Sequence, residues 1–310
     1  MKVLVTGGAG FIGAHLAAAL VDAGHGVRII DDLSTGFLWR IQKLLPRIEF
    51  LEGSICNPGI VAGAVSGMDA VLHQAAIPSV ARSNADPVGT CGANVLGTVS
   101  LLQASREAGV KRLVYAASSS AYGTSPKLPK VETMCPNPLS PYAVSKLAGE
   151  QYCQVFAGLG FVETVCLRYF NIYGPMQDPN SQYAAVVPRF TQALLRREPL
   201  PLEGDGTHSR DFTYVDNAVQ ANLLALTANG VSGEVFNIGC GERYSLDLLI
   251  GELSSIIGFA PDIQRLPGRP GDVPHSLADI SKARRMLGYS PVVEFGEGLR
   301  RTVRWFQQRP

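Results

Sequence analysis

The chain has 310 residues, of which 46% are hydrophobic and 17% are charged, so it can bury a large core in one large domain or two joined ones. Its 27 basic and 26 acidic residues leave a net charge of +1. This balance gives no electrostatic reason to expect nucleic acid or an anionic membrane as a partner.

No apolar run approaches the roughly 18 residues that a transmembrane helix needs, so we predict no membrane span. The first residues do not resemble a secretory signal, because glycines interrupt the apolar run from Gly7 onward. The six cysteines form no CxxC pair and no metal-ligand spacing with the five dispersed histidines. We therefore expect reduced thiols in a cytoplasmic protein without a metal site.

The N-terminal segment predicts a strand, a tight glycine turn, a helix and a second strand that ends in an acidic residue. The first strand is Val3–Thr6, and the turn TGGAGFIG covers 6–13. A helical pattern follows over His15–Ala23, and the second strand, Val27–Ile30, leads into Asp31. This order is typical of a dinucleotide-binding βαβ unit.

Each residue type in this unit suits one part of a dinucleotide. Gly7 permits the turn, Gly10 lets the backbone approach the pyrophosphate, and Gly13 lets the helix pack closely on the strand. The unpaired N–H groups at the helix start meet the phosphates. Asp31 can accept hydrogen bonds from the adenosine ribose, and Asp31 with Asp32 would repel a 2′-phosphate, which favours NAD over NADP.

Strands and helices alternate through the first 170 or so residues, as expected for a Rossmann-like, doubly wound parallel sheet of the α/β class. The further predicted strands are Ile48–Leu51, Ala70–His73, Leu113–Ala116 and Thr164–Arg168, and helices are predicted over Val95–Ala108 and Tyr142–Ala157. Ligands of such sheets bind beyond the carboxyl ends of the strands.

Turn-forming residues become dense after Asn171, which predicts a change of domain. We assign residues 1–172 to the NAD-binding domain and 173–310 to a smaller mixed α/β lobe that binds the substrate. A helix over Arg210–Ala228 and a strand over Val235–Ile238 are expected to return to the main sheet, so 210–239 belongs with the first domain.

A serine-rich strand end and a tyrosine–lysine pair supply the candidate catalytic groups. Tyr142 and Lys146 are four positions apart and share one face of the predicted helix. A nearby ammonium stabilises a phenolate, and bringing a tyrosine pKa from about 10 to near 7 requires roughly 4 kcal/mol. Such a phenolate is a general base for a sugar hydroxyl, and a serine hydroxyl can bridge the two.

The chain resembles the extended short-chain dehydrogenase/reductase family over essentially its full length, and within it the UDP-sugar 4-epimerases, especially those acting on UDP-N-acetylglucosamine. The matching stretches are TGGAGFIG, HQAA (73–76), AASSSAYG (116–123), SPYAVSK (140–146), LRYFNIYG (167–174), QDPN (177–180), SRDFTYV (209–215) and GDVPHSLADISKA (271–283). The resemblance implies a tightly held NAD and a reversible epimerisation at the sugar C4 through a 4-keto sugar.

The resemblance also implies roles for individual residues. Tyr142 would be the base at the sugar O4, Lys146 would hold the nicotinamide ribose, and Ser118 would hydrogen-bond O4 with Ser119 beside it. The implied cofactor site comprises Gly7, Gly10, Phe11, Ile12, Gly13, Asp31, Asp32, Ser34, Thr35, Gly36, Ser54, Ile55, Gln74, Ala75, Ala76, Asn94, Ala116, Tyr142, Lys146 and Tyr169. The implied substrate site comprises Ser79, Ser118, Ser119, Ser120, Asn171, Gln177, Ala185, Val186, Pro201, Glu203, Arg210, Arg269, Asp272 and Ser276.

Three positions distinguish this chain within the family it resembles. Ser119 and Ser120 stand where the family's dehydratases and decarboxylases carry an acidic pair, so elimination is disfavoured. Ser276 stands where a bulky tyrosine restricts some epimerases to non-acetylated sugars, and its small side chain leaves room for an acetamido group. Ser54 replaces the aspartate that usually contacts the adenine amino group.

Several alternatives stay open at this point. Within the enzymes they are a UDP-glucose or UDP-glucuronate 4-epimerase and a related nucleotide-sugar dehydratase. Outside the enzymes, the chain could sense NAD without catalysis. By resemblance, the helices over Val95–Ala108 and Tyr142–Ala157 are expected to pair with a second copy in a homodimer.

Overall fold

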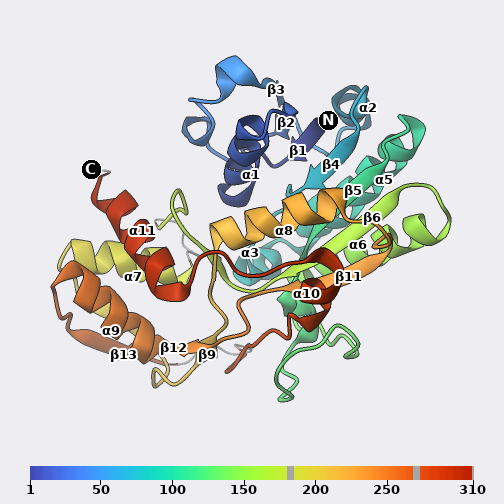
Figure 1. Cartoon of the computed structure of the whole chain (residues 1–310). Helices are drawn as coiled ribbons and strands as arrows, with labels where there is room; N and C mark the ends of the chain where they lie inside the picture. The colour runs from blue at the N-terminus through green and yellow to red at the C-terminus, as the bar shows by residue number, and fades with distance from the viewer. Residues whose placement is uncertain (180–184, 268–272, 309–310) are drawn as a thin grey trace.

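The computed structural model describes residues 1–179, 185–267 and 273–308 (Figure 1). A seven-stranded parallel sheet forms its centre, in the order β3-β2-β1-β4-β5-β6-β11. The strands are β1 (Lys2–Thr6), β2 (Gly26–Asp31), β3 (Glu49–Glu52), β4 (Ala70–His73), β5 (Arg112–Ser118), β6 (Glu163–Tyr169) and β11 (Glu234–Ile238). The predicted doubly wound α/β fold is confirmed.

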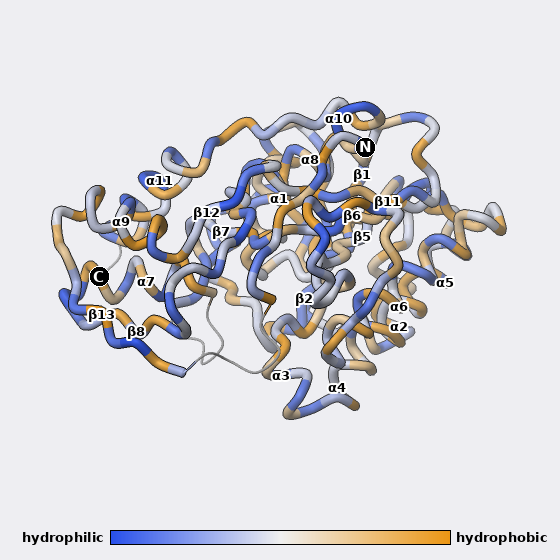
Figure 2. Tube along the Cα trace, turned by 90° about the horizontal axis from the view of Figure 1, so that it is seen from below, coloured by the Kyte–Doolittle hydropathy of each residue, from blue (hydrophilic) through white to orange (hydrophobic). Residues whose placement is uncertain are grey.

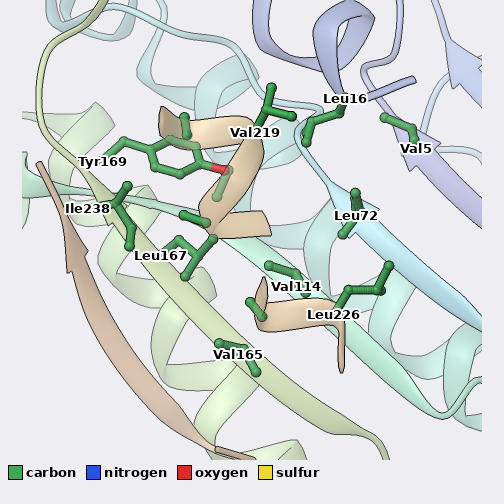
Figure 3. Close-up of a cluster of buried hydrophobic side chains, with 14 of the residues drawn as sticks. Val5, Leu16, Leu72, Val114, Val165, Leu167, Tyr169, Val219, Leu226 and Ile238 are labelled. Atoms are coloured by element: carbon green, nitrogen blue, oxygen red, sulfur yellow. The ribbon is translucent and has the colours of Figure 1, made fainter. Parts of the chain in front are cut away.

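Helices cover both faces of this sheet because successive strand residues alternate between two apolar cores. One face carries α1 (Phe11–Asp22), α8 (Val215–Thr227) and α10 (Ser281–Leu287), and the other carries α2 (Pro58–Val65), α5 (Gly97–Glu107) and α6 (Pro141–Gly158). Figure 3 shows the first core, where Val5, Leu72 and Val114 of the strands meet Leu16 of α1 and Leu226 of α8.

Short elements connect the main strands. A 3-10 turn over Leu38–Arg40 and another over Leu45–Arg47 join β2 to β3, and a third, Ser119–Tyr122, follows β5 directly. After β4 the chain forms α3 (Val80–Ala85), α4 (Pro87–Cys91) and a π-helical turn over Gly92–Leu96 that runs into α5. The helix predicted over Val95–Ala108 thus starts within this π turn.

The second lobe packs helices against three two-stranded sheets, β7 with β10, β9 with β12, and β8 with β13. Its elements are β7 (Ile172–Tyr173), α7 (Val186–Leu195), β8 (Leu200–Glu203), β9 (Ser209–Arg210), β10 (Thr213–Tyr214), β12 (Tyr244–Ser245), α9 (Leu246–Ile257), β13 (Ile263–Leu266) and α11 (Phe295–Gln307). Their shared core includes Phe190, Phe212, Leu249, Phe295 and Leu299.

The segment between 209 and 239 crosses from this lobe to the main sheet. Its first residues form β9 and β10 of the second lobe, so the helix predicted to begin at Arg210 begins instead at Val215. α8 then packs beside α1, and β11 adds to the edge of the sheet next to β6. The division into residues 1–172 and 173–310 stays a prediction.

Polar and apolar residues interchange along the trace in Figure 2. Within the described part of the chain, no helix is both long and apolar enough to cross a bilayer. α11 illustrates the amphipathic pattern, because its buried residues include Phe295, Leu299, Val303 and Phe306, spaced three or four apart along one face.

One buried carboxylate joins three segments at the boundary between the lobes. Asp211 is fully buried and accepts hydrogen bonds from the backbone N–H groups of Cys240 (2.8 Å), Gly241 (3.0 Å) and Ala278 (3.1 Å). Burial raises the pKa of Asp211 to about 6, against the effect of these three donors.

We predict that Asp211→Ala lowers the free energy of unfolding by about 3 kcal/mol or more, because it leaves three backbone donors without their acceptor. Urea denaturation measures the change. The matched control is Asp22→Ala, which removes an exposed carboxylate paired with Arg47 at 3.2 Å and should cost less than about 1 kcal/mol. Equal losses in the two variants would contradict the prediction.

Candidate active site

A cavity of about 430 Å³ opens beyond the carboxyl ends of β1 to β5, where a doubly wound sheet binds its ligand. Its walls come from the glycine turn, from the ends of β2 and β3, from the segment after β4, and from α6. Twenty-one of the residues predicted for the site line it, namely Gly7, Gly10, Phe11, Ile12, Gly13, Asp31, Asp32, Ser34, Thr35, Ser54, Ile55, Gln74, Ala75, Ala76, Ser79, Ala116, Tyr142, Lys146, Tyr169, Gln177 and Ala185.

The glycine turn has no room for side chains at two positions. Gly7 has a φ of +67°, and a Cβ there would lie 2.7 Å from the Cα of Ala75. At Gly13 a Cβ would lie 2.2 Å from the carbonyl oxygen of Gly7, so only glycine lets α1 approach the turn this closely. No side chain caps the first turn of α1, and its residues Phe11 and Ile12 line the cavity. This exposed helix start suits a pyrophosphate.

Asp31 organises the end of β2. Its Oδ2 accepts the N–H of Ala9 and its Oδ1 accepts the N–H of Leu33, both at 2.9 Å, while burial raises the pKa of the carboxyl. Gly36 lies against the same carboxylate, because a Cβ there would be 2.6 Å from Oδ1. The carboxylate is therefore fixed at the cavity wall, and its contact with the adenosine ribose stays a prediction.

Tyr142 and Lys146 lie in the first two turns of α6, whose N-cap is Ser140. Lys146 is 5% exposed, and its Nζ donates to the carbonyl of Ala116 at 2.8 Å and lies 5.0 Å from the ring centroid of Tyr115. Burial lowers the pKa of Lys146 to about 8. Both side chains reach the same cavity.

The electrostatic setting of the phenol differs from the expectation of a pKa near 7. Burial raises the pKa of Tyr142, and a hydrogen bond with the Ser118 side chain opposes this rise without cancelling it. Ser118 in turn accepts a hydrogen bond from the hydroxyl of Ser120 at 2.8 Å. The phenol thus has a polar partner in Ser118, and burial is the larger influence on its pKa.

A buried hydrogen-bonded chain supports α6 from behind, and the sequence analysis did not identify it. Thr6 hydrogen-bonds to Nδ1 of His73 (2.7 Å), and Nε2 of His73 to Oγ1 of Thr98 (2.9 Å). Thr98 donates to the carbonyl of Asn94, so Nε2 of His73 is the protonated nitrogen. Burial lowers the pKa of His73 to about 3, which keeps the ring neutral. His73 is the first residue of the HQAA motif (73–76), so the motif already marked this position in the sequence.

Asn94 is part of this hydrogen-bonded chain behind α6 and does not line the cavity. Its Nδ2 donates to the hydroxyl of Ser145 (3.0 Å), and its Oδ1 accepts the N–H of Ile77 (2.7 Å). Ser145 donates to the carbonyl of Tyr142 at 2.8 Å. Asn94 therefore acts on the cavity through α6 and the segment after β4.

The other predicted substrate residues that the structure describes do not line this cavity: Ser118, Ser119 and Ser120 lie at the end of β5 in the first domain, and the rest lie in or next to the second lobe. Asn171, in a left-handed conformation with φ of 39°, donates from Nδ2 to the hydroxyl of Ser276 at 3.1 Å. Arg210 donates to the carbonyl of Pro274 at 3.0 Å. Ser119, Val186, Pro201 and Glu203 are also placed outside the lining, and Arg269 and Asp272 fall outside the described residues.

Sequence reasoning missed two arginines of the cavity wall, Arg40 and Arg82. It also missed Arg189, which donates to the carbonyl of Pro201 (3.2 Å) and pairs with Glu203 (3.3 Å). Arg82 follows the HQAA motif closely, and that position was its only signal. Arg40 had none, because its contacts come from the tertiary structure.

We predict that the ¹³Cε chemical shift of Lys146 in protein without nucleotide titrates with a midpoint near pH 8. Because the folded pKa is lowered, the ammonium is present below that pH and its support of a phenolate is lost as the pH rises through 8. Lys146→Met assigns the signal by removing it. A midpoint above about pH 10, the ordinary range of lysine, would contradict the burial argument.

The comparisons with known proteins agree with this geometry. The profile of the NAD dependent epimerase/dehydratase family matches residues 3–239. Among solved structures, the UDP-glucose 4-epimerase of Thermotoga maritima is 38% identical, covers 99% of both chains and has a TM-score of 0.95.

Two further similar structures are named for UDP-sugars other than UDP-glucose. The UDP-N-acetylglucosamine 4-epimerase of Methanobrevibacter ruminantium is 35% identical, with a TM-score of 0.95 over 100% of this chain and 99% of the other. The UDP-glucuronic acid 4-epimerase of Bacillus cereus is 36% identical, with a TM-score of 0.92 over 99% of both chains. Sequence identity alone therefore does not indicate which UDP-sugar this chain uses.

Proposed function

The chain belongs to the NAD-dependent epimerase/dehydratase family, and on that premise we propose that it interconverts UDP-N-acetylglucosamine and UDP-N-acetylgalactosamine. It is a UDP-sugar 4-epimerase of the extended short-chain dehydrogenase/reductase type, an isomerase that uses NAD. The acetylated sugar rests on the side chains described below, above all on a buried acceptor of Gln177.

The residues of the cavity suit NAD, because the glycine turn leaves room for a pyrophosphate and Asp31 offers a carboxylate for a ribose. When bound, NAD supplies the hydride acceptor for C4 of the sugar and gives the hydride back. Tyr142 takes and returns the O4 proton, and Ser118 holds the phenol in place. An ammonium at Lys146, whose side chain reaches the same cavity as the phenol, would favour the phenolate.

The end of β5 favours epimerisation over elimination. Ser119 and Ser120 follow Ser118 in a 3-10 turn, and neither position carries a carboxylate. Without a carboxylic acid there, the turn has no group to protonate a leaving hydroxyl at a neighbouring carbon. A 4-keto sugar is therefore expected to be reduced again rather than dehydrated.

Our proposal of an acetylated sugar depends mainly on the side chain of Gln177. The side chain lines the cavity, and its Nε2 donates to the carbonyl of Ile172 at 3.3 Å. Its Oε1 is buried and has no hydrogen-bond partner among the described residues. A buried acceptor without a donor is costly, and the N–H of a 2-acetamido group is a donor of the right kind. Ser276, which accepts a hydrogen bond from Asn171, is small, and by the family resemblance this leaves room for the acetamido group.

A second candidate, UDP-glucuronate, is favoured by Arg82. Its guanidinium lines the cavity and makes no hydrogen bond or ion pair to the described residues. A sugar carboxylate would give it a partner. Arg82 does not explain the orphaned acceptor of Gln177, which a carboxylate oxygen would leave unsatisfied.

Exposed apolar side chains support a proposed homodimer. Val88 and Leu96 of the α4–α5 region and Val144, Val155 and Leu159 of α6 and its end are each more than half exposed. Burial of such a surface against a second copy would remove this area from water. A cytoplasmic location is proposed from the free thiols at Cys56, Cys91 and Cys135, all exposed.

We predict that the purified protein converts UDP-N-acetylglucosamine faster than UDP-glucose or UDP-glucuronate, as followed by NMR of the products. Tyr142→Phe should lower kcat by about 10² to 10⁴ while keeping bound NAD, because only the proton transfer is lost. Tyr152→Phe, an exposed tyrosine on the same helix, is the control and should keep full activity. Full activity of Tyr142→Phe would reject the catalytic assignment, and no turnover of the acetylated sugar would reject the substrate.

We predict that Gln177→Leu lowers kcat/KM for UDP-N-acetylglucosamine about ten-fold, since it removes one hydrogen bond, and leaves UDP-glucose within about two-fold. Ser276→Tyr should exclude the acetylated sugar by its bulk, whereas Ser276→Ala should not. Steady-state kinetics with both sugars measures these ratios. Equal effects on both sugars in Gln177→Leu would mean that this amide does not recognise the acetamido group.

A further inference from the structure

The chain has two tryptophans, and they come from opposite ends of the sequence to lie against one another. Trp39 belongs to the 3-10 turn after β2, and Trp305 belongs to α11. Their ring centroids are 6.3 Å apart with an interplanar angle of 26°, a stacked arrangement. Phe37 also stacks on Trp39, with ring centroids 6.2 Å apart, so an aromatic ladder of Phe37, Trp39 and Trp305 joins the first domain to the second lobe.

Arg40 makes a polar connection beside this ladder. Its side chain is buried, its Nε donates to the carbonyl of Met176 in the second lobe (3.0 Å), and its Nη1 donates to the carbonyl of Ala9 in the glycine turn (3.3 Å). The guanidinium lies 4.8 Å from the ring centroid of Phe37 and 5.1 Å from that of Trp39. Arg40 thus joins the turn, the aromatic ladder and the second lobe.

These contacts close one side of the cavity. Residues 32–36 connect Asp31 to the aromatic ladder. Three of them, Asp32, Ser34 and Thr35, line the cavity together with Arg40. The N–H of Phe37 donates to the carbonyl of Ala9 at 3.0 Å. A dinucleotide held between the glycine turn and this segment cannot leave on that side unless the segment moves, and such a movement separates Trp39 from Trp305 and Arg40 from Met176.

An epimerase regenerates its cofactor in every cycle and so gains nothing by releasing it. We propose that Trp39, Arg40 and Trp305 form a clasp that retains NAD between turnovers. The clasp is built from positioning residues, since it acts through the segment 32–36 and not on the reacting atoms. The proposal rests on NAD binding and is independent of which UDP-sugar is the substrate.

The release rate of NAD tests the clasp without any sugar nucleotide present. Protein loaded with etheno-NAD, a fluorescent analogue, is mixed with excess NAD, and the fluorescence change gives the rate of release. Trp39→Leu, Trp305→Leu and Arg40→Lys should each release the analogue about ten-fold faster, as expected for the loss of one stacking or charge-assisted contact. Both tryptophan variants remove the Trp39–Trp305 contact, and Trp39→Leu also removes the contacts of Trp39 with Phe37 and Arg40, so the double variant should be no faster than Trp39→Leu alone.

Phe161→Leu is the matched control, because it removes an aromatic ring under the guanidinium of Arg106, 3.7 Å from the ring centroid, away from the cavity. It should leave the release rate unchanged. Far-UV circular dichroism verifies that each variant folds. If one tryptophan variant does not fold, the release rates of Arg40→Lys and of the other tryptophan variant test the clasp. Release rates within about two-fold of the parent in the folded variants would overturn the clasp, whatever sugar the enzyme proves to use.

Discussion

The close approach of α1 to the end of β1 is the constraint on which the rest of the site depends. A Cβ at Gly13 would collide with the carbonyl of Gly7, so the glycines decide where the helix starts and where its N–H groups point. Asp31 then ties the same turn to the end of β2 through the N–H of Ala9. These two contacts fix the helix start and the carboxylate that we predict to meet the phosphates and the ribose of NAD.

Burial governs the chemistry of the catalytic pair. It lowers the pKa of Lys146 to about 8 and raises the pKa of Tyr142, so the two pKa values, which ordinarily lie close together near 10, move apart, with that of the lysine now the lower one. Neither residue sits on a flexible loop, because α6 is supported from behind by Asn94 and Ser145 and laterally by the carbonyl of Ala116. This rigidity fixes the phenol relative to Ser118, as an acid–base group requires.

The two lobes divide the work of holding the ligand. The first domain supplies fixed backbone donors and a carboxylate, which suit a cofactor that stays bound. The second lobe supplies Gln177, with its buried unpartnered oxygen, and the hydrogen-bonded Asn171–Ser276 pair, to which we assign the choice of sugar in our proposal. Arg40 and the stacked tryptophans connect the lobes, so the proposed clasp would couple retention of the cofactor to the placement of the second lobe.

The sequence by itself determined the sheet, the glycine turn, Asp31 and the Tyr142–Lys146 pair, because these features depend on local spacing and on the order of strands and helices. Through a family resemblance it also predicted Gln177 as a substrate residue, and Gln177 lines the cavity. Only the tertiary structure decided that the acceptor of Gln177 is left without a donor, that Asn94 lies behind the cavity, and that Trp39 meets Trp305. Those facts depend on burial and on contacts between distant segments, which no local pattern records.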